Sequence, residues 1–123
     1  MSFKISILGA TGNVGREILS IIEERKFPVD ELFLLASSKS EGKKLSFGKK
    51  EISVSDLNKF DFKKCDLTFS SAGSKIASEF APKITNSGCI IIDNSSYFRM
   101  DPDVPLIVPE VNSEDLQTIK KKI

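Results

Sequence analysis

The sequence contains no histidine, so the side chain that most often serves as a general base is missing from any chemistry of this chain. It has only two cysteines, too few for a disulfide framework, and we therefore expect reduced thiols and a cytoplasmic protein. Neither charge sign dominates: 18 Lys and Arg face 17 Asp and Glu, which predicts no nucleic-acid or membrane partner. Every apolar run is far shorter than the roughly 20 residues of a membrane span. Because the N-terminus runs directly into a strand pattern, we expect no signal peptide.

What the sequence does contain is a regular alternation of short apolar runs and amphipathic stretches. The 123 residues, 40% of them hydrophobic, suffice for one domain with one core. The alternation predicts an α/β, Rossmann-type doubly wound fold, with a mostly parallel sheet and helices on both faces. We expect strands at 3–8, 32–36, 66–70, 89–93 and 106–108, an edge hairpin of 43–47 and 51–54, and helices at 13–25, 74–86 and 113–121.

A glycine-rich segment joins the first predicted strand to the first predicted helix. It reads Gly9-Ala10-Thr11-Gly12-Asn13-Val14-Gly15. Glycines at such a turn let backbone N–H groups approach a pyrophosphate at the helix N-terminus. The spacing GxxGxxG meets the usual GxGxxG fingerprint only in part. The segment predicts dinucleotide binding, and the alternative is a glycine-rich turn that binds nothing.

The end of the second predicted strand bears on which dinucleotide is bound. An NAD site needs an acidic residue there for the ribose 2′-hydroxyl. This sequence has Ala36-Ser37-Ser38-Lys39-Ser40 instead. Hydroxyls and a lysine donate to a 2′-phosphate that a carboxylate would repel, so the pattern favours NADP. The same residues would also make an ordinary polar loop.

Several segments resemble bacterial aspartate-semialdehyde dehydrogenases. The most specific are Asp93-Asn94-Ser95-Ser96 continuing to Arg99-Met100, and Pro109-Glu110-Val111-Asn112. The others lie at 9–17, 23–29, 34–37 and 71–73. Together they extend over essentially the whole chain. The resemblance implies NADPH-dependent reduction of an aspartyl phosphate to aspartate semialdehyde, with release of phosphate, in the biosynthesis of lysine, threonine and methionine.

The resemblance also implies roles for individual residues, all of them in ligand binding. The pyrophosphate would lie on Gly9, Thr11, Gly12, Asn13 and Val14, the 2′-phosphate on Ser37, Lys39 and Ser40, and the nicotinamide beside Ala72 and Gly73. The family often has arginine where Lys39 stands, so a bidentate clamp is replaced by a point charge and a weaker preference for NADP is expected.

Arg99 would bind the acyl phosphate or free phosphate. It follows the carboxyl end of a predicted parallel strand, where open α/β sheets bind ligands, and a guanidinium suits phosphate oxygens. The alternative is a surface arginine paired with Asp101 or Asp103. Asn94 would either touch the ligand or cap a turn, and for Asn112 a helix cap is the simplest role.

The family's chemistry needs a cysteine thiolate that forms a thioester before hydride transfer. Its cysteine stands in an Asn-Cys-Ser/Thr motif beyond the segments matched here. Cys65 follows Lys63 and Lys64, which would lower its pKa somewhat, but it precedes a strand, away from the ligand-binding loops. Cys89 begins an apolar strand and is expected to be a small buried hydrophobe. We therefore expect no catalytic residue and no metal in this chain.

Residues 1–123 are thus expected to be an NAD(P)-binding domain without the catalytic cysteine and without the substrate-binding and dimerisation domain. The small-molecule acyl phosphate and the homodimer belong to the full-length family. Two alternatives remain: a cofactor domain of the N-acetylglutamyl-phosphate reductase type, and a stand-alone, non-catalytic NADP-binding module. We expect the isolated chain to be a marginally stable, aggregation-prone monomer.

Overall fold

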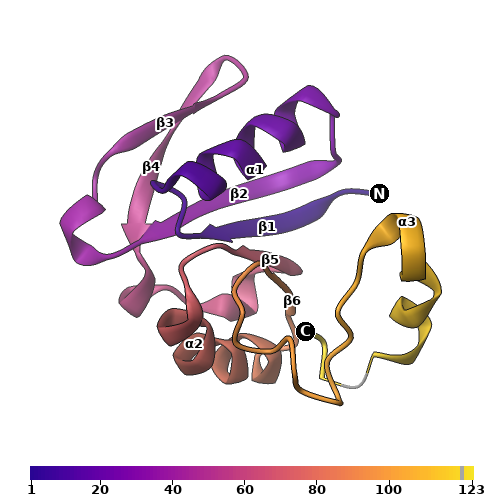
Figure 1. The fold of residues 1–123 in the computed structure, drawn as a ribbon. Helices are drawn as coiled ribbons and strands as arrows, with labels where there is room; N and C mark the ends of the chain where they lie inside the picture. The colour runs from indigo at the N-terminus through magenta and orange to yellow at the C-terminus, as the bar shows by residue number, and fades with distance from the viewer. Residues whose placement is uncertain (120) are drawn as a thin grey trace.

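The computed structural model describes residues 1–119 and 121–123, which form a six-stranded sheet with helices on both faces (Figure 1). The strands are β1 Phe3–Leu8, β2 Val29–Ala36, β3 Lys44–Phe47, β4 Lys50–Asp56, β5 Leu67–Ser70 and β6 Ile90–Asp93. The helices are α1 Asn13–Glu24, α2 Ser74–Asn86 and the short α3 Pro109–Asn112. Short 3-10 turns are η1 Ser38–Ser40, η2 Leu57–Lys59, η3 Phe62–Lys64 and η4 Ser113–Thr118. The predicted fold class is confirmed.

The order of the strands places a ligand-binding position at the middle of the sheet. The order is β3-β4-β2-β1-β5-β6, and every pair is parallel except the β3–β4 hairpin at one edge. The chain builds outward from β1 through β2 to β4 and then crosses to β5 and β6 on the other side. Open α/β sheets bind ligands outside the carboxyl ends of their strands where the order reverses, which here is beside β1.

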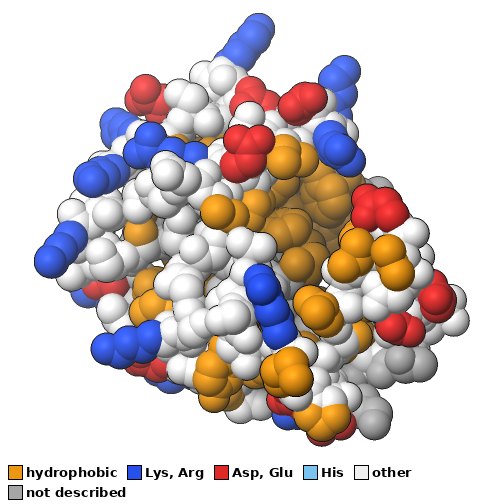
Figure 2. Space-filling model, in the orientation of Figure 1, with side chains coloured by type: hydrophobic (Ala, Val, Ile, Leu, Met, Phe, Trp, Pro, Cys, Tyr) orange, Lys and Arg blue, Asp and Glu red, His pale blue; other side chains and the backbone are white. Residues whose placement is uncertain are grey.

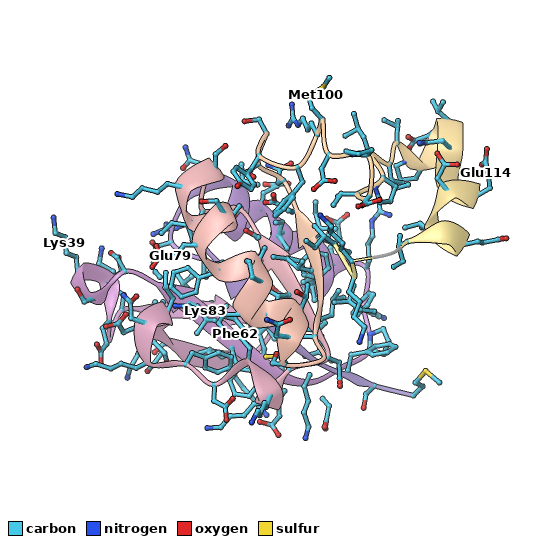
Figure 3. The ribbon with its side chains drawn as sticks, turned by 90° about the horizontal axis from the view of Figure 1, so that it is seen from below. Lys39, Phe62, Glu79, Lys83, Met100 and Glu114 are labelled. Atoms are coloured by element: carbon cyan, nitrogen blue, oxygen red, sulfur yellow. The ribbon has the colours of Figure 1, made fainter. Side chains whose placement is uncertain are left out.

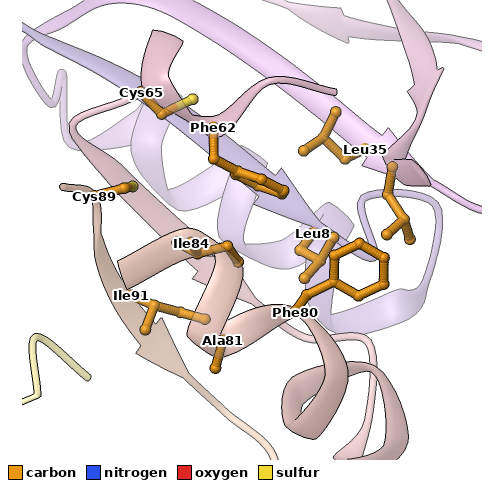
Figure 4. Close-up of a cluster of buried hydrophobic side chains, with 10 residues drawn as sticks. Leu8, Leu35, Phe62, Cys65, Phe80, Ala81, Ile84, Cys89 and Ile91 are labelled. Atoms are coloured by element: carbon orange, nitrogen blue, oxygen red, sulfur yellow. The ribbon is translucent and has the colours of Figure 1, made fainter. Parts of the chain in front are cut away.

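Two hydrophobic clusters hold the helices to the sheet, because successive strand residues point to opposite faces. On the α1 face, Ile7 and Leu34 pack with Leu19 and Ile22 of the helix. On the α2 face, Leu8 and Leu35 pack with the residues of α2 and its neighbours shown in Figure 4, which include Phe62, Phe80, Ala81, Ile84 and Ile91. This alternation confirms that both faces of β1 and β2 are buried.

A row of hydrogen-bonded polar side chains also crosses the buried face of the sheet that α2 covers. Ser6 Oγ lies 2.7 Å from Thr68 Oγ1, and Thr68 Oγ1 lies 3.2 Å from Cys89 Sγ. All three residues are completely buried, so these hydrogen bonds satisfy groups that water cannot reach. Cys89 is therefore buried as expected, and it also has a hydrogen-bond partner.

Some predicted strands have other bounds in the structure, and one does not form. Strand β2 begins at Val29, which the proline-containing segment 27–30 placed in a turn. The predicted strand at 106–108 does not form. Its backbone groups are hydrogen-bonded to the side chain of Asn112 instead of to another strand: Asn112 Nδ2 donates to Leu106 O (2.8 Å), and Val108 N donates to Asn112 Oδ1 (2.7 Å).

In place of the predicted helix at 113–121 the structure has the 3-10 turn η4, which directly follows α3, and position 120 of that prediction lies outside the described residues. Asn112 does not cap η4, since its side chain holds the preceding loop instead. No helix in the described ranges is long and apolar enough to cross a membrane.

Candidate functional site

The loop between β1 and α1 is built on close backbone packing. Gly15 is buried, and a Cβ there would collide with the carbonyl of Gly9 and lie 2.8 Å from Ala10 Cα. Gly9 has φ +84°, and a Cβ on it would come within 3.0–3.1 Å of the backbone of Ser71 and Ala72. These two glycines therefore let α1 and the loop after β5 approach the end of β1.

Gly12 is different, because it faces outward. A Cβ there would meet only Gly9 O, at 3.5 Å, and its backbone is extended, with φ −78° and ψ 171°. Gly12 is also the N-cap of α1, yet no side chain caps the helix and its first turn has no acidic residue. The N–H groups of the first turn, next to Thr11, Asn13 and Val14, are thus left for an anion.

The polar residues predicted at the end of β2 form η1. Ser40 N donates to Ser37 O (2.9 Å), which closes the turn, and Lys39 stands exposed on it. Figure 3 shows the Lys39 side chain extending away from the body of the protein. Lys39 forms no ion pair with any residue that the structure describes. Its cation is therefore available to an external phosphate.

The loops after β1, β5 and β6 adjoin one another. Ser71 holds the first two together, since its backbone N and its Oγ both donate to Leu8 O, at 2.9 and 3.1 Å. Asn94 N donates to Ser70 O (2.9 Å), and Ser74 Oγ lies 3.0 Å from Ser96 Oγ. Gly73, with φ +89°, is the N-cap of α2, which also lacks a side-chain cap. Ala72 and Gly73 are therefore at the same edge of the sheet as Gly12.

Arg99 is held near the end of β6 with its charge unneutralised by the described residues. Its Nη2 donates to Asn94 O at 3.4 Å, and it forms no ion pair among the residues described. The predicted alternative of a pair with Asp101 is not formed, because Asp101 pairs with Lys121 at 3.0 Å. The N–H of Asp103, and after it the contact with Lys121, hold the pKa of Asp101 below its ordinary value.

Asp93, the last residue of β6, is engaged within its own turn. Ser95 N donates to Asp93 Oδ1 (3.0 Å), and Ser95 Oγ donates to Asp93 Oδ2 (2.6 Å). The turn is thus capped by Asp93 and Ser95, and the Asn94 side chain makes no hydrogen bond with the described residues. Of the two roles predicted for Asn94, the turn cap is taken by its neighbour.

A cavity of about 490 Å³ lies beside β6 and the segment that follows it. Its polar lining includes Asn94 and Arg99, and most of the rest is apolar, from Ile92, Phe98 and Leu106. Figure 2 shows a hollow with hydrophobic side chains on the face drawn in Figure 1. Arg99 and Asn94 therefore share one concave surface, separate from the first turn of α1.

The two thiols are poorly suited to nucleophilic chemistry. Burial raises the pKa of the Cys65 thiol to about 12, against the lowering effect of a hydrogen bond with Ser6. The lowered pKa predicted for Cys65 from Lys63 and Lys64 is therefore wrong, because desolvation dominates and raises it. Burial also raises the pKa of Cys89. No group of His, Cys, Asp and Glu in the described part of the chain has the arrangement of a metal site.

Two residues at this edge were not predicted from sequence. Ser71 ties the loops after β1 and β5 together, and a serine directly after a strand gives no distinctive signal. Asp56, the last residue of β4, is only 6% exposed and lies beside Ala36. The signal for Asp56 was an acidic residue at the end of a strand with alternating apolar residues. It was missed because that strand was expected to end at 54.

Known proteins resemble this chain closely. A family profile described as "Semialdehyde dehydrogenase, NAD binding domain" matches residues 4–119. An aspartate-semialdehyde dehydrogenase from Aquifex aeolicus is 55% identical over 123 residues, which cover 99% of this chain and 36% of that protein.

Solved structures of aspartate-semialdehyde dehydrogenases also resemble this chain. Aspartate semialdehyde dehydrogenase II from Vibrio cholerae, complexed with ASA, has a TM-score of 0.94 at 45% identity, covering 96% of this chain and 39% of that one. Aspartate semialdehyde dehydrogenase with NADP from Candida albicans has a TM-score of 0.78 at 29% identity, covering 94% of this chain and 36% of that one. The chain thus spans about a third of the length of these relatives.

Proposed function

Because the chain belongs to the semialdehyde dehydrogenase family, to its NAD-binding domain, we propose that residues 1–123 are the NADP-binding part of an aspartate-semialdehyde dehydrogenase. The observation that carries the proposal is the uncapped start of α1 at the point where the strand order reverses. Gly12 leaves the space in front of it open, and backbone N–H groups with the helix dipole attract a pyrophosphate there.

The residues present fit the cofactor along the carboxyl edge of the sheet. Gly9, Thr11, Gly12, Asn13 and Val14 would hold the pyrophosphate, while Ser37, Lys39 and Ser40 would hold the 2′-phosphate. Ala72 and Gly73 would border the nicotinamide. The exposed cation of Lys39, which pairs with no described residue, and the absence of an acid at the end of β2 support NADP over NAD. A bound nicotinamide supplies hydride chemistry.

Arg99 and Asn94 are proposed to bind the phosphate of an acyl-phosphate substrate or free phosphate. Among the described residues the guanidinium donates to Asn94 O and forms no ion pair, and Asp93, which lines the same cavity, is engaged by Ser95. The aspartyl phosphate, its reduction to the semialdehyde and the release of phosphate are proposals for the complete protein.

We assign no catalytic residue to residues 1–123. The chain has no histidine, and both of its cysteines are free and buried. The catalytic cysteine, the substrate-binding domain and the homodimer are proposed to belong to the two thirds of the relatives' length that this chain does not match. Free thiols also agree with the proposed cytoplasmic location.

Calorimetric titration with NADPH and NADH tests the cofactor site, using Gly12→Trp as the blocking variant. The backbone of Gly12 is one that any residue adopts, and a Cβ there meets nothing closer than 3.5 Å, so the fold should tolerate the indole while the pyrophosphate should not. We expect saturable binding with NADPH preferred, and at least about a hundredfold weaker binding by the variant, if most of the pyrophosphate contacts are lost.

The matched control is Ser20→Trp, which places the same side chain on an exposed position of the same helix. It should bind NADPH as the wild type does. Equal binding by wild type and Gly12→Trp would show that the cofactor does not occupy the start of α1. Absence of binding by a chain with a normal circular dichroism spectrum would mean that these residues alone do not form a cofactor site.

A further inference from the structure

Asp56 ends β4 at the same edge of the sheet as the proposed cofactor loops. Its Cα partner across the ladder is Ala36, the last residue of β2. The residues that follow the two strands lie close together, because Gly42 N donates to Val54 O (2.9 Å) and Lys59 Nζ lies 3.8 Å from Glu41 Oε2. Asp56 thus sits one strand beyond the proposed 2′-phosphate loop.

The carboxylate of Asp56 is buried, but only half of its hydrogen-bonding capacity is used. The residue is 6% exposed, and its Oδ1 accepts from Asn58 N (2.9 Å) and Asn58 Nδ2 (3.2 Å). No described residue donates to Oδ2 or pairs with the charge. Ser70 Oγ is the one fully enclosed, unpartnered side-chain atom among those described, so Oδ2 of Asp56 is open to solvent. An accessible oxygen on an otherwise buried carboxylate can accept a hydrogen bond from a ligand, and a hydrogen bond to a charged group contributes more than one between neutral groups.

The order of the strands says which part of the cofactor reaches this oxygen. Neighbouring strands are roughly 4.8 Å apart, so the ends of β1, β2 and β4 form three steps along the edge. The proposed pyrophosphate site is at the first step and the proposed 2′-phosphate site is at the second. The base attached to that ribose is the group that extends to the third step.

We infer that Asp56 recognises the adenine of the cofactor, with Oδ2 accepting a hydrogen bond from its exocyclic amino group. The inference rests on the proposed NADP function and deepens it. Adenine carries an amino donor at this position, whereas hypoxanthine carries a carbonyl, which a carboxylate repels. The site thereby distinguishes adenine dinucleotides from their deaminated forms through one oxygen.

The test compares NADPH with its hypoxanthine analogue, using calorimetry on the wild type and on Asp56→Asn. In the variant, Oδ1 still accepts from Asn58, while an amide N–H₂ replaces Oδ2 and donates to a carbonyl. We expect the wild type to prefer NADPH by about tenfold, the magnitude of one buried hydrogen bond to a charged group. Asp56→Asn should remove or reverse that preference, with NADPH weakened and the analogue strengthened.

Asp61→Asn is the matched control. Asp61 also accepts from a backbone N–H two residues on, that of Lys63 at 3.0 Å, but it is exposed and stands before β5, away from the carboxyl edge. This variant should keep the wild-type base preference. The NADPH to NADH ratio is measured with each protein, because it reports on the 2′-phosphate and should be the same in the wild type and in Asp56→Asn.

Each other outcome has a definite meaning. An unchanged base preference in folded Asp56→Asn would refute the inference, as would equal weakening of both dinucleotides with a lower melting temperature, since Asp56 would then only cap η2. A shift in the NADPH to NADH ratio instead would place the carboxylate against the ribose. If the wild type binds no dinucleotide, the proposed function fails first; if it binds both bases equally, only the role of Asp56 fails.

Discussion

At the scale of the residue, the glycines of one motif have different structural roles. Gly9 and Gly15 are required by backbone contacts, whereas Gly12 leaves space in front of a helix. The sequence predicted the loop and its ligand class because glycine at a strand-to-helix turn has few other uses. The sequence could not tell the packing glycines from Gly12. The contacts that distinguish them, of Gly15 with Gly9 and of Gly9 with Ser71, exist only in the folded chain.

Gly15→Ala should therefore destabilise the fold more than Gly12→Ala does. The new Cβ at 15 would overlap the backbone of Gly9 and Ala10, which cannot move aside as a flexible side chain would. We expect a loss of at least about 2 kcal/mol in the free energy of unfolding in urea, against less than about 1 kcal/mol for Gly12→Ala. Similar losses in the two variants would contradict the packing described for α1.

The buried thiol of Cys65 gives stability a dependence on pH. Its pKa is about 12 in the folded chain and near 9.0 when exposed, mainly because burial disfavours the thiolate. Its contribution is therefore complete below about pH 9 and is lost as pH rises toward 12. The measured quantity is the difference between wild type and Cys65→Ala, which isolates the contribution of this thiol. The free energy of unfolding of the wild type should fall more steeply between pH 9 and 11; parallel curves would refute this.

At the scale of the element, prediction succeeded where the apolar periodicity and the flanking glycines or prolines indicate the same bounds. Helix α2 was predicted with its observed bounds, because its apolar spacing lies between Gly73 and Gly88. Strand β2 was predicted too short, since Pro28 suggested a turn. In fact Phe3 N donates to Pro28 O (2.9 Å), and the pairing of β1 with β2 begins there. The apolar run 106–108 has the composition of a strand, but a strand needs a neighbouring strand to pair with. Here the side chain of Asn112 forms hydrogen bonds with the backbone of Leu106 and Val108 instead.

Asn112→Ala should loosen the segment 106–112 without unfolding the sheet. Three hydrogen bonds of the Asn112 side chain would be lost, to Leu106 O, Val108 N and Asp115 Oδ2. Since these groups are exposed, we expect a cost of about 1 kcal/mol, confined to this segment. Amide hydrogen exchange should accelerate at Val108 and stay unchanged at Ile7 in β1. The control is Gln117→Ala, an exposed residue of η4; faster exchange at Val108 in that variant as well would mean that Asn112 has no special role.

At the scale of the whole molecule, exposed apolar residues are concentrated at one side. In the described part of the chain, Ile90 and Ile92 of β6 are 42% and 52% exposed, and Leu106, Val108, Val111 and Leu116 are also exposed on the segment that follows. Clustered apolar surface of this kind marks an interaction site or promotes association. Ile91, between the two exposed isoleucines, is 1% exposed and packs against α2. One strand therefore has a face that stabilises the fold and a face that does not.

The two faces of β6 should respond oppositely to charge. Ile92→Lys removes an exposed apolar side chain, so the isolated chain should stay monomeric at higher concentration in sedimentation or scattering experiments, with a melting temperature close to that of the wild type. Ile91→Lys buries an unpaired ammonium among the residues of the α2-face cluster, and we expect it to unfold the chain. A wild-type chain that is monomeric at high concentration and melts sharply at high temperature would contradict the expected marginal stability. A chain whose association is unaffected by Ile92→Lys would show that its self-association does not proceed through β6.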